Sequence, residues 1–320
     1  MPTVRLLIIM AAFLFALSGN AHGALKVVAT LKPVHSLLAG LMRDVAEPRL
    51  LLDDSQSPHS TSLKPSQIRM LNEADLIVWV GAELEPALSH LLKPQAYRAE
   101  VVSLMETPDL LLLPMRDRHE WHSHGQHHNQ QSDHPDQSPK PNVYDNHIWL
   151  SPENAAAMVR HLTGKLIELD NANSASYSNN SQRLLNRLKT LDRQIQADLA
   201  TIASAPYIVF HDAYQYFEAH YGMHTLGTVN ISPEQLSGAR HIHRLRQTIK
   251  QRDARCLFTE PQFEPKLVNT LAEGLGVKIG QLDPLGMQLP TGPDCVISRC
   301  SGGLPTICST VSPWSNSNES

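Results

Sequence analysis

Histidines carry most of the chemistry that this sequence could perform. The chain of 320 residues contains 17 histidines, and three of them, His59, His147 and His211, lie in polar stretches close to short apolar runs. Asp283 ends a further apolar run. Three neutral imidazoles and one carboxylate provide the four ligands that tetrahedral Zn²⁺ accepts, whereas Ca²⁺ and Mg²⁺ prefer shells of oxygen atoms. We therefore predict a metal site formed by these four residues.

A second group of histidines lies in one polar segment without hydrophobic periodicity. Residues 119–141 read HEWHSHGQHHNQQSDHPDQSPKP, which cannot pack a core and predicts a mobile loop. Its first two histidines are three residues apart in a loop, so they do not form the helical metalloprotease motif, which spaces its histidines by four. Imidazoles bind Zn²⁺, Cu²⁺ and Ni²⁺, so we interpret the loop as an accessory metal-binding segment; the alternative is a solvated insertion that happens to be histidine-rich. The six imidazoles belong to His119, His122, His124, His127, His128 and His134.

Two sets of strands and helices must position the four predicted ligands. Short β-branched runs alternate with amphipathic stretches, a pattern typical of parallel sheets with helices on their faces. The first set has expected strands at 26–31, 49–52, 75–80 and 100–102, with helices at 33–43, 65–72 and 85–92. The second has strands at 207–210, 225–228, 256–259 and 277–282, with helices at 213–221, 239–251 and 265–274. We therefore predict an α/β fold with two lobes, each a mostly parallel sheet flanked by helices.

Two helices are expected between the lobes. One opens at Ser151-Pro152 and runs to about residue 169, and a longer one spans about 174–202 with leucine and isoleucine at three- and four-residue spacing. The long helix should act as a rigid connection between the lobes. Ligands in doubly wound folds bind where the strand carboxyl ends open, and His59, His147, His211 and Asp283 all fall at such positions. The metal should therefore lie in the cleft between the lobes.

The chain ends and the net charge limit the function classes further. Arg5 precedes an apolar run that is shorter than a membrane span, and small residues follow, which predicts a signal peptide cut after Gly23. The net charge of −4 excludes a nucleic-acid binder that neutralises phosphates. The expected organisation is a signal peptide at 1–23, an N-terminal lobe at 24–150 that includes the histidine-rich loop 119–140, connecting helices at 151–203, a C-terminal lobe at 204–290 and an atypical tail at 291–320.

Several motifs of this chain resemble the periplasmic zinc-binding component of bacterial zinc ABC importers, a branch of the metal-binding solute-binding proteins. The resemblance extends from about residue 25 to 286. The motifs occur in family order: TLKPVHSL at 30–37, SPHSTSLKPSQ at 57–67, ADLIVWVG at 74–81, NHIWLSPENA at 146–155, VFHDAYQYFE at 209–218, TEPQF at 259–263 and LDPLG at 282–286.

The resemblance implies a function and a set of ligands. The family's three histidine ligands match His59, His147 and His211, its carboxylate position matches Asp283, and its histidine-rich insertion matches the loop at 119–134. It implies capture of periplasmic Zn²⁺ as transported cargo and delivery to a membrane permease and, through it, to a cytoplasmic ATPase. We expect a monomer that acts as a binding protein, not as an enzyme. Manganese-binding relatives generally place a glutamate where His211 stands, so His211 favours zinc.

Three other functions compete with zinc transport as interpretations of the sequence. The first is a manganese- or iron-binding homologue, and the second is an adhesin or metal buffer whose loop alone binds metal in several weak equivalents. The third is a zinc-dependent hydrolase, for which Asp212 and Glu260 are the nearest candidate general bases. We instead interpret Asp212 as a helix cap and Glu260 as a structural hydrogen-bond acceptor, and a fourth ligand at Asp283 would close the shell against water.

The carboxyl end departs from the family pattern. Residues 288–320 are rich in Ser, Thr, Gly, Pro and Cys and show no helical period, where relatives usually end in an amphipathic helix, and we interpret this as an out-of-frame or truncated ending. In relatives the position of Cys256 pairs with a cysteine near the C-terminus. The altered tail gives that partner no positional match, so Cys256, Cys295, Cys300 and Cys308 leave the disulfide pairing open.

Overall fold

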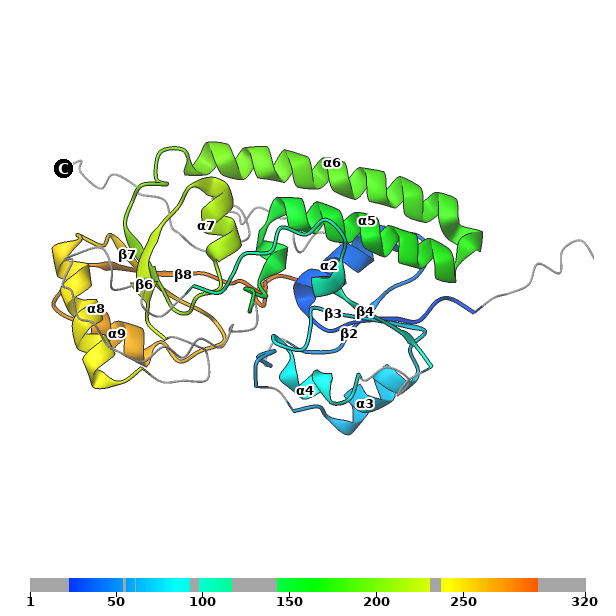
Figure 1. The fold of residues 1–320 in the computed structure, drawn as a ribbon, viewed down its shortest axis with the longest axis horizontal. Helices are drawn as coiled ribbons and strands as arrows, with labels where there is room; N and C mark the ends of the chain where they lie inside the picture. The colour runs from blue at the N-terminus through cyan, green and yellow to red at the C-terminus, as the bar shows by residue number, and fades with distance from the viewer. Residues whose placement is uncertain are drawn as a thin grey trace, which may run out of the picture.

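The computed structural model describes residues 23–53, 56–60, 62–92, 98–116, 143–230 and 237–292. These residues form two α/β lobes beneath a pair of long helices (Figure 1). Each lobe contains one four-stranded parallel sheet, in the orders β2-β1-β3-β4 and β6-β5-β7-β8. The two lobes therefore repeat one topology, in which the strand order reverses beside the first strand of each set.

The N-terminal lobe is built from β1 to β4 with helices between the strands. Val28 pairs with Arg49 on one side and Ile77 on the other, and Ile77 pairs in turn with Val101, all in parallel. Both outer faces of β1 and β3 are covered, so every residue of these strands is buried. The elements are β1 Val27–Ala29, α2 Lys32–Leu41, β2 Arg49–Leu50, α3 Pro65–Asn72, β3 Leu76–Trp79, α4 Pro86–Ser89, β4 Glu100–Ser103 and the 3₁₀ turn η1 Leu104–Glu106.

The C-terminal lobe has the same arrangement around its first strand. Tyr207 pairs with Thr225 on one side and Cys256 on the other, and Cys256 pairs with Lys278 at the far edge. Gly222 ends α7 in the left-handed conformation (φ +67°), which a residue without a Cβ adopts freely. The elements are β5 Tyr207–Val209, α7 Gln215–Tyr221, β6 Thr225–Thr228, α8 Ala239–Gln251, β7 Cys256–Thr259, α9 Lys266–Ala272 and β8 Lys278–Gln281.

Two long helices connect the lobes and lie side by side above them (Figure 1). The 3₁₀ turn η3 (Ile148–Leu150) leads into α5 (Pro152–Leu169), where the Ser151 side chain accepts a hydrogen bond from the Asn154 backbone N–H as an N-cap. The short η4 (Asn171–Asn173) then leads into α6 (Ser174–Leu199), 26 residues and therefore about 39 Å long.

The packing of α6 makes the molecule one structural unit. Its buried side chains recur every three or four residues and belong to the same apolar cluster as residues of both sheets, among them Val28 and Val209. Asn180 in this stripe donates to the backbone oxygens of Leu41 and Arg43 at the carboxyl end of α2, where the helix itself provides no N–H donor. A second apolar cluster fills the space between the C-terminal sheet and α8 and α9, with Ile208, Leu245 and Val268 in it.

The structure confirms the predicted fold class of two parallel-sheet lobes flanked by helices and joined by a long helix. Most element boundaries differ from prediction by only a few residues, and α6 ends at Leu199, three residues earlier than expected. No helix in the described part of the chain is long and apolar enough to cross a membrane. The expected signal peptide up to residue 22, the histidine-rich loop, and the tail beyond residue 292 lie outside the described residues.

Candidate metal centre

Three histidines from distant parts of the sequence meet between the lobes. His59 lies in the turn that follows β2, His147 stands immediately before η3, and His211 follows the carboxyl end of β5. Each histidine lies in a loop or turn between a strand and a helix. One ligand atom from each histidine lies within 4.8 Å of the corresponding atoms of the other two. The structure therefore brings together three of the four residues predicted to bind metal.

The imidazole rings surround a common centre. The ring centroids are 5.8 Å apart for His59 and His147, 6.0 Å for His59 and His211, and 5.4 Å for His147 and His211. In a tetrahedral zinc shell with bonds of about 2.0 Å, neighbouring nitrogens lie about 3.3 Å apart. The ligand nitrogens of the three histidines lie within 4.8 Å of one another here, so each pair must approach by about 1.5 Å or less to bind one zinc ion.

Two carboxylates fix the orientation of two of the rings. His147 Nδ1 lies 2.7 Å from Asp145 Oδ1, and His211 Nδ1 lies 2.8 Å from Glu260 Oε1. Because Nδ1–H donates to the carboxylate in each case, the lone pair of a neutral ring is on Nε2, the atom that can bind a metal. The buried Nε2 of His211 has no hydrogen-bond partner among the described residues, as expected of an atom that awaits a cation. The two carboxylates would also balance the charge of one divalent ion.

Burial and neighbouring charges shift the pKa of two site histidines in opposite directions. Burial, with repulsion from His147 and His211, lowers the pKa of His59 to about 3, so this ring stays neutral and ready to bind a metal in acid. Burial also lowers the pKa of His211, but attraction and hydrogen bonding from Glu260 outweigh it and leave the pKa raised. Metal binding at His211 must therefore displace a proton more often than at His59.

The space between the rings suits a single ion. The cavity has a volume of about 10 Å³, close to the minimum that holds one water molecule. One metal ion fits in such a space. Trp149 and Phe263 contribute apolar walls, and the Trp149 and His147 ring centroids are 5.3 Å apart.

Asp283 lies beside the cavity but is not part of the group of three ligands. Its Oδ2 accepts a 3.0 Å hydrogen bond from the Gln288 backbone N–H, and its Oδ1 lies 3.5 Å from Gln262 Nε2. The carboxylate is buried, and the next two residues, Pro284 and Leu285, line the cavity. In this structure, Asp283 orders the chain that follows β8.

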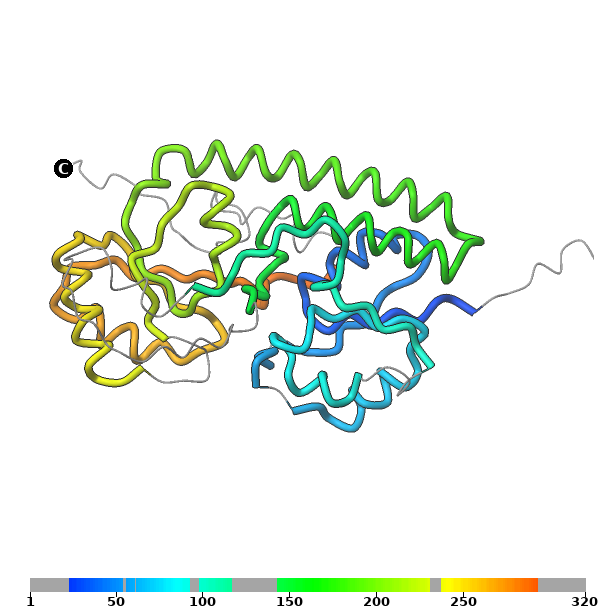
Figure 2. Tube along the Cα trace, viewed as in Figure 1, coloured from blue at the N-terminus to red at the C-terminus, as the bar shows by residue number. Residues whose placement is uncertain are grey.

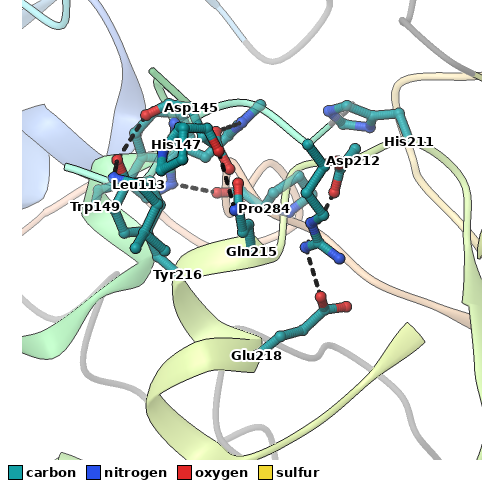
Figure 3. Close-up of polar contacts among 12 residues, drawn as sticks. Leu113, Asp145, His147, Trp149, His211, Asp212, Gln215, Tyr216, Glu218 and Pro284 are labelled. Atoms are coloured by element: carbon teal, nitrogen blue, oxygen red, sulfur yellow. Dashed lines mark hydrogen bonds and ion pairs between the residues drawn. The ribbon is translucent and has the colours of Figure 1, made fainter. Parts of the chain in front are cut away.

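A buried polar network that the sequence did not reveal supports the site (Figure 3). Arg116, the last described residue before the histidine-rich segment, lies 2.6 Å from Glu218 Oε2 and 3.1 Å from Asp212 Oδ1. Tyr216 donates through its hydroxyl to the Asp145 backbone oxygen at 2.8 Å. Residues 113–116 and 143–145, which flank the loop, are therefore fastened to α7 next to the supports of His147 and His211. Spacing alone gave no signal for Arg116, because its partners are about 100 residues away in the sequence.

The two candidate general bases have other contacts. Asp212 was expected to cap the helix that follows it, but α7 has no side-chain cap, and Asp212 pairs with Arg116 instead. Burial raises the pKa of Asp212 to about 6, while Arg116 partly opposes this shift. Glu260 has the structural role predicted for it, because Oε1 accepts from His211 and from the Tyr214 hydroxyl.

The sequence matches a known family over most of its length. The family described as zinc-uptake complex component A, periplasmic, matches residues 27–294. Its relatives include the high-affinity zinc uptake system protein ZnuA of Brucella abortus strain 2308, 34% identical over 315 residues, with 92% of this chain and 94% of that protein covered. The ZnuA protein of Yersinia pestis is 34% identical over 279 residues, and the alignment covers 86% of this chain and 87% of that protein. This chain belongs to the zinc-uptake component A family.

Solved structures share the two-lobed fold of this chain. A crystal structure of ZnuA superposes with a TM-score of 0.69 at 24% identity, covering 83% of this chain and 93% of that one. The laminin-binding protein of Streptococcus agalactiae, described as bifunctional with adhesin and metal transporting activity, gives a TM-score of 0.67 at 21% identity and covers 82% and 90% of the two chains. At these identities the structures show the two-lobed fold alone.

Two sequence predictions cannot be placed in the described structure. The six loop histidines, from His119 to His134, lie outside the described residues, and so do three of the four cysteines. Cys256 is half-buried and forms no disulfide with any residue in the described ranges, and burial raises the pKa of its thiol to about 11.

Proposed function

We propose that this chain captures Zn²⁺ in the periplasm and delivers it to the membrane permease of a zinc ABC transporter. The convergence of His59, His147 and His211 on a cavity for one ion is the observation that carries this proposal. Three imidazoles provide borderline ligands that suit Zn²⁺, and two carboxylates, Asp145 and Glu260, fix one ring each. Membership of the zinc-uptake component A family supports the cargo and the delivery to a permease.

The finer assignments belong to the same proposal. The three histidines are the zinc ligands, and Asp283 supplies the fourth when its carboxylate leaves the Gln288 N–H. The loop histidines His119–His134 act as an accessory site that collects zinc. The protein works as a monomer, and a signal peptide cut after Gly23 exports it. It binds zinc without catalysing a reaction, because both candidate general bases have other partners. Glu260 accepts from His211 and Tyr214, and Asp212 pairs with Arg116.

Calorimetric zinc titration tests the proposal. The mature chain should bind one tight equivalent, and replacement of His59, His147 and His211 by alanine should remove it. A matched variant replaces three histidines outside the site, His90, His161 and His224, and should keep it. If the site variant retained the tight equivalent, or if the matched variant lost it, the three-histidine centre would not be the binding site.

Two experiments distinguish zinc transport from manganese transport and from a metal buffer. Replacing the imidazole of His211 with a carboxylate hardens the site, so His211→Glu should shift preference from Zn²⁺ towards Mn²⁺ in competition experiments. A metal buffer based on the loop alone would bind several weak equivalents and would lose them all when residues 119–134 are deleted.

A further inference from the structure

A short segment after β8 crosses from the C-terminal lobe to the N-terminal lobe beside the metal cavity. We name residues 283–288 the crossing segment. Figure 2 shows the orange end of the described chain running from the C-terminal sheet towards the blue N-terminal elements. Pro284 and Leu285 form one wall of the cavity. The segment is therefore in contact both with the site and with the boundary between the lobes.

Two side chains of the N-terminal half hold the crossing segment by its backbone. Trp149 Nε1 donates to the Pro284 oxygen at 2.8 Å, and Lys32 Nζ donates to the Met287 oxygen at 2.9 Å. Lys32 is only 5% exposed, so its ammonium group needs such acceptors to offset its lost hydration. Within the segment, the Gly286 N–H bonds to the Asp283 oxygen, and Gly286 has φ +66°, which fixes a tight turn.

The two donors connect different parts of the site. Trp149 stands two residues after His147, and the two rings are in contact. Lys32 opens α2, directly after β1, in the lobe that carries His59. The crossing segment thus links the sheet that positions His59 to the loop that positions His147.

The segments that carry His147 and His211 are held in place by contacts with α7 and Arg116. The Tyr216 hydroxyl of α7 bonds to the Asp145 backbone oxygen next to His147, and Asp212 next to His211 pairs with Arg116. Among the described residues, no contact from α7 supports His59 in this way, and His59 is half-buried while His147 and His211 are buried. The distance between His59 and the other two rings therefore depends on how the N-terminal lobe is held.

We propose that Lys32 and Trp149 are positioning residues that prolong the residence of bound zinc by holding the crossing segment between the lobes. Neither side chain needs to touch the ion. When both hydrogen bonds are in place, the lobes keep His59 against the other two histidines; when they break, His59 withdraws and the ion leaves. This proposal rests on the proposed function, because it assumes that zinc occupies the three-histidine site.

Zinc dissociation kinetics test the proposal in the full mature protein. The zinc-loaded protein is mixed with an excess of chelator, and metal release is followed by the absorbance of the chelator complex. Lys32→Met and Trp149→Phe should each raise the dissociation rate constant about tenfold, the effect of losing one such hydrogen bond, while the association rate changes less than twofold. Trp149→Phe keeps an aromatic wall and removes the N–H donor, so it remains informative if Lys32→Met fails to fold.

Three comparisons separate positioning from general destabilisation. Lys32→Arg keeps a donor and should restore slow release, whereas Lys26→Met removes an exposed charge from the same lobe and should release zinc like the wild type. The double variant should be no faster than about twice the faster single variant, because both bonds hold one segment. Unchanged release in folded Lys32→Met and Trp149→Phe, or equal acceleration in Lys26→Met, would overturn the inference. Failure of the wild type to bind zinc would instead refute the proposed function.

Discussion

Glu260 holds His211 by its Nδ1 nitrogen at 2.8 Å and leaves Nε2 directed away from this bond, without a partner among the described residues. The carboxylate is almost completely buried, and the Tyr214 hydroxyl also donates to it. A rigid acceptor of this kind selects the tautomer and orientation of a histidine before any metal arrives. The orientation of His211 therefore depends on a residue that does not itself belong to the group of three histidines.

Replacing Glu260 with glutamine should weaken zinc binding about 10- to 100-fold, the usual cost of losing a carboxylate behind a metal-binding histidine. The amide retains the size of the side chain but loses the negative charge that supports the imidazole. Competition with a zinc chelator measures the affinity. Glu264→Gln, which changes an exposed glutamate in the same lobe, is the control and should bind like the wild type. Equal affinities for Glu260→Gln and the wild type would show that Glu260 does not prepare His211.

Zinc binding should release protons near neutral pH. The Glu260 carboxylate outweighs burial and raises the pKa of His211 from its ordinary value, so this ring holds its proton to higher pH than a free imidazole does. His59, with a pKa of about 3, contributes none. Affinity should therefore rise with pH through the neutral range and level off above the pKa of His211.

Calorimetry in buffers of different ionisation enthalpy measures this proton release. Glu260→Gln removes the charge that raises the pKa of His211, so it should release fewer protons than the wild type. Proton release of the same size in both proteins would assign it to another group.

Glu85 should make the metal-free protein less stable as pH rises. Complete burial raises the pKa of Glu85 to about 7 in the folded protein, and the hydrogen bond from the Val80 N–H, 2.7 Å long, only partly opposes this shift. In the unfolded chain the same carboxyl has a pKa near 4.5. Its stabilising contribution is therefore complete below pH 4.5 and is lost as pH rises towards 7 and above. Glutamine does not titrate. The free energy of unfolding of Glu85→Gln, relative to that of the wild type, should therefore increase by on the order of 2 to 3 kcal/mol from pH 5 to pH 8.

Urea unfolding of both proteins at pH 5 and pH 8 measures that difference. Glu83→Gln is a control, because its carboxylate is exposed. A free-energy difference between Glu85→Gln and the wild type that stays constant with pH would contradict the assigned titration.

Deletion of residues 119–134 should leave the tight zinc equivalent in place. His147 and His211 are held by Asp145 and Glu260, and both described flanks of the loop are attached to α7. Only weak additional equivalents should disappear, as calorimetric titration with excess zinc can show. Loss of the tight equivalent in a folded deletion variant would make the loop part of the main site.

The sequence alone predicted that the three histidines lie close together, because each of them follows or precedes an apolar segment at one edge of the fold. His211 follows a buried β-branched strand, and parallel strands present their carboxyl ends at one edge, so its placement followed from periodicity. Helix α6 was equally predictable, because apolar residues such as Leu184, Leu188 and Ile195 recur at helical spacing.

The supporting contacts could not be predicted in the same way. Arg116 and Lys32 act through partners 102 and 255 residues away, and single-sequence spacing carries no signal for such pairs. The prediction that Asp212 caps a helix was wrong because a buried arginine outcompetes a free backbone N–H for a carboxylate. The ligand role of Asp283 stays a prediction, since turn formation uses its carboxylate here.

Zinc-edge X-ray absorption of the stoichiometric complex tests the central claim most directly. Three imidazoles should appear, with Zn–N distances of about 2.0 to 2.1 Å, together with one oxygen donor. Alanine in place of His59 should reduce the imidazole number to two, and Asp283→Ala should change only the oxygen donor. A spectrum dominated by sulfur or oxygen ligands, or one that the His59 substitution leaves unchanged, would contradict a centre built from these three histidines.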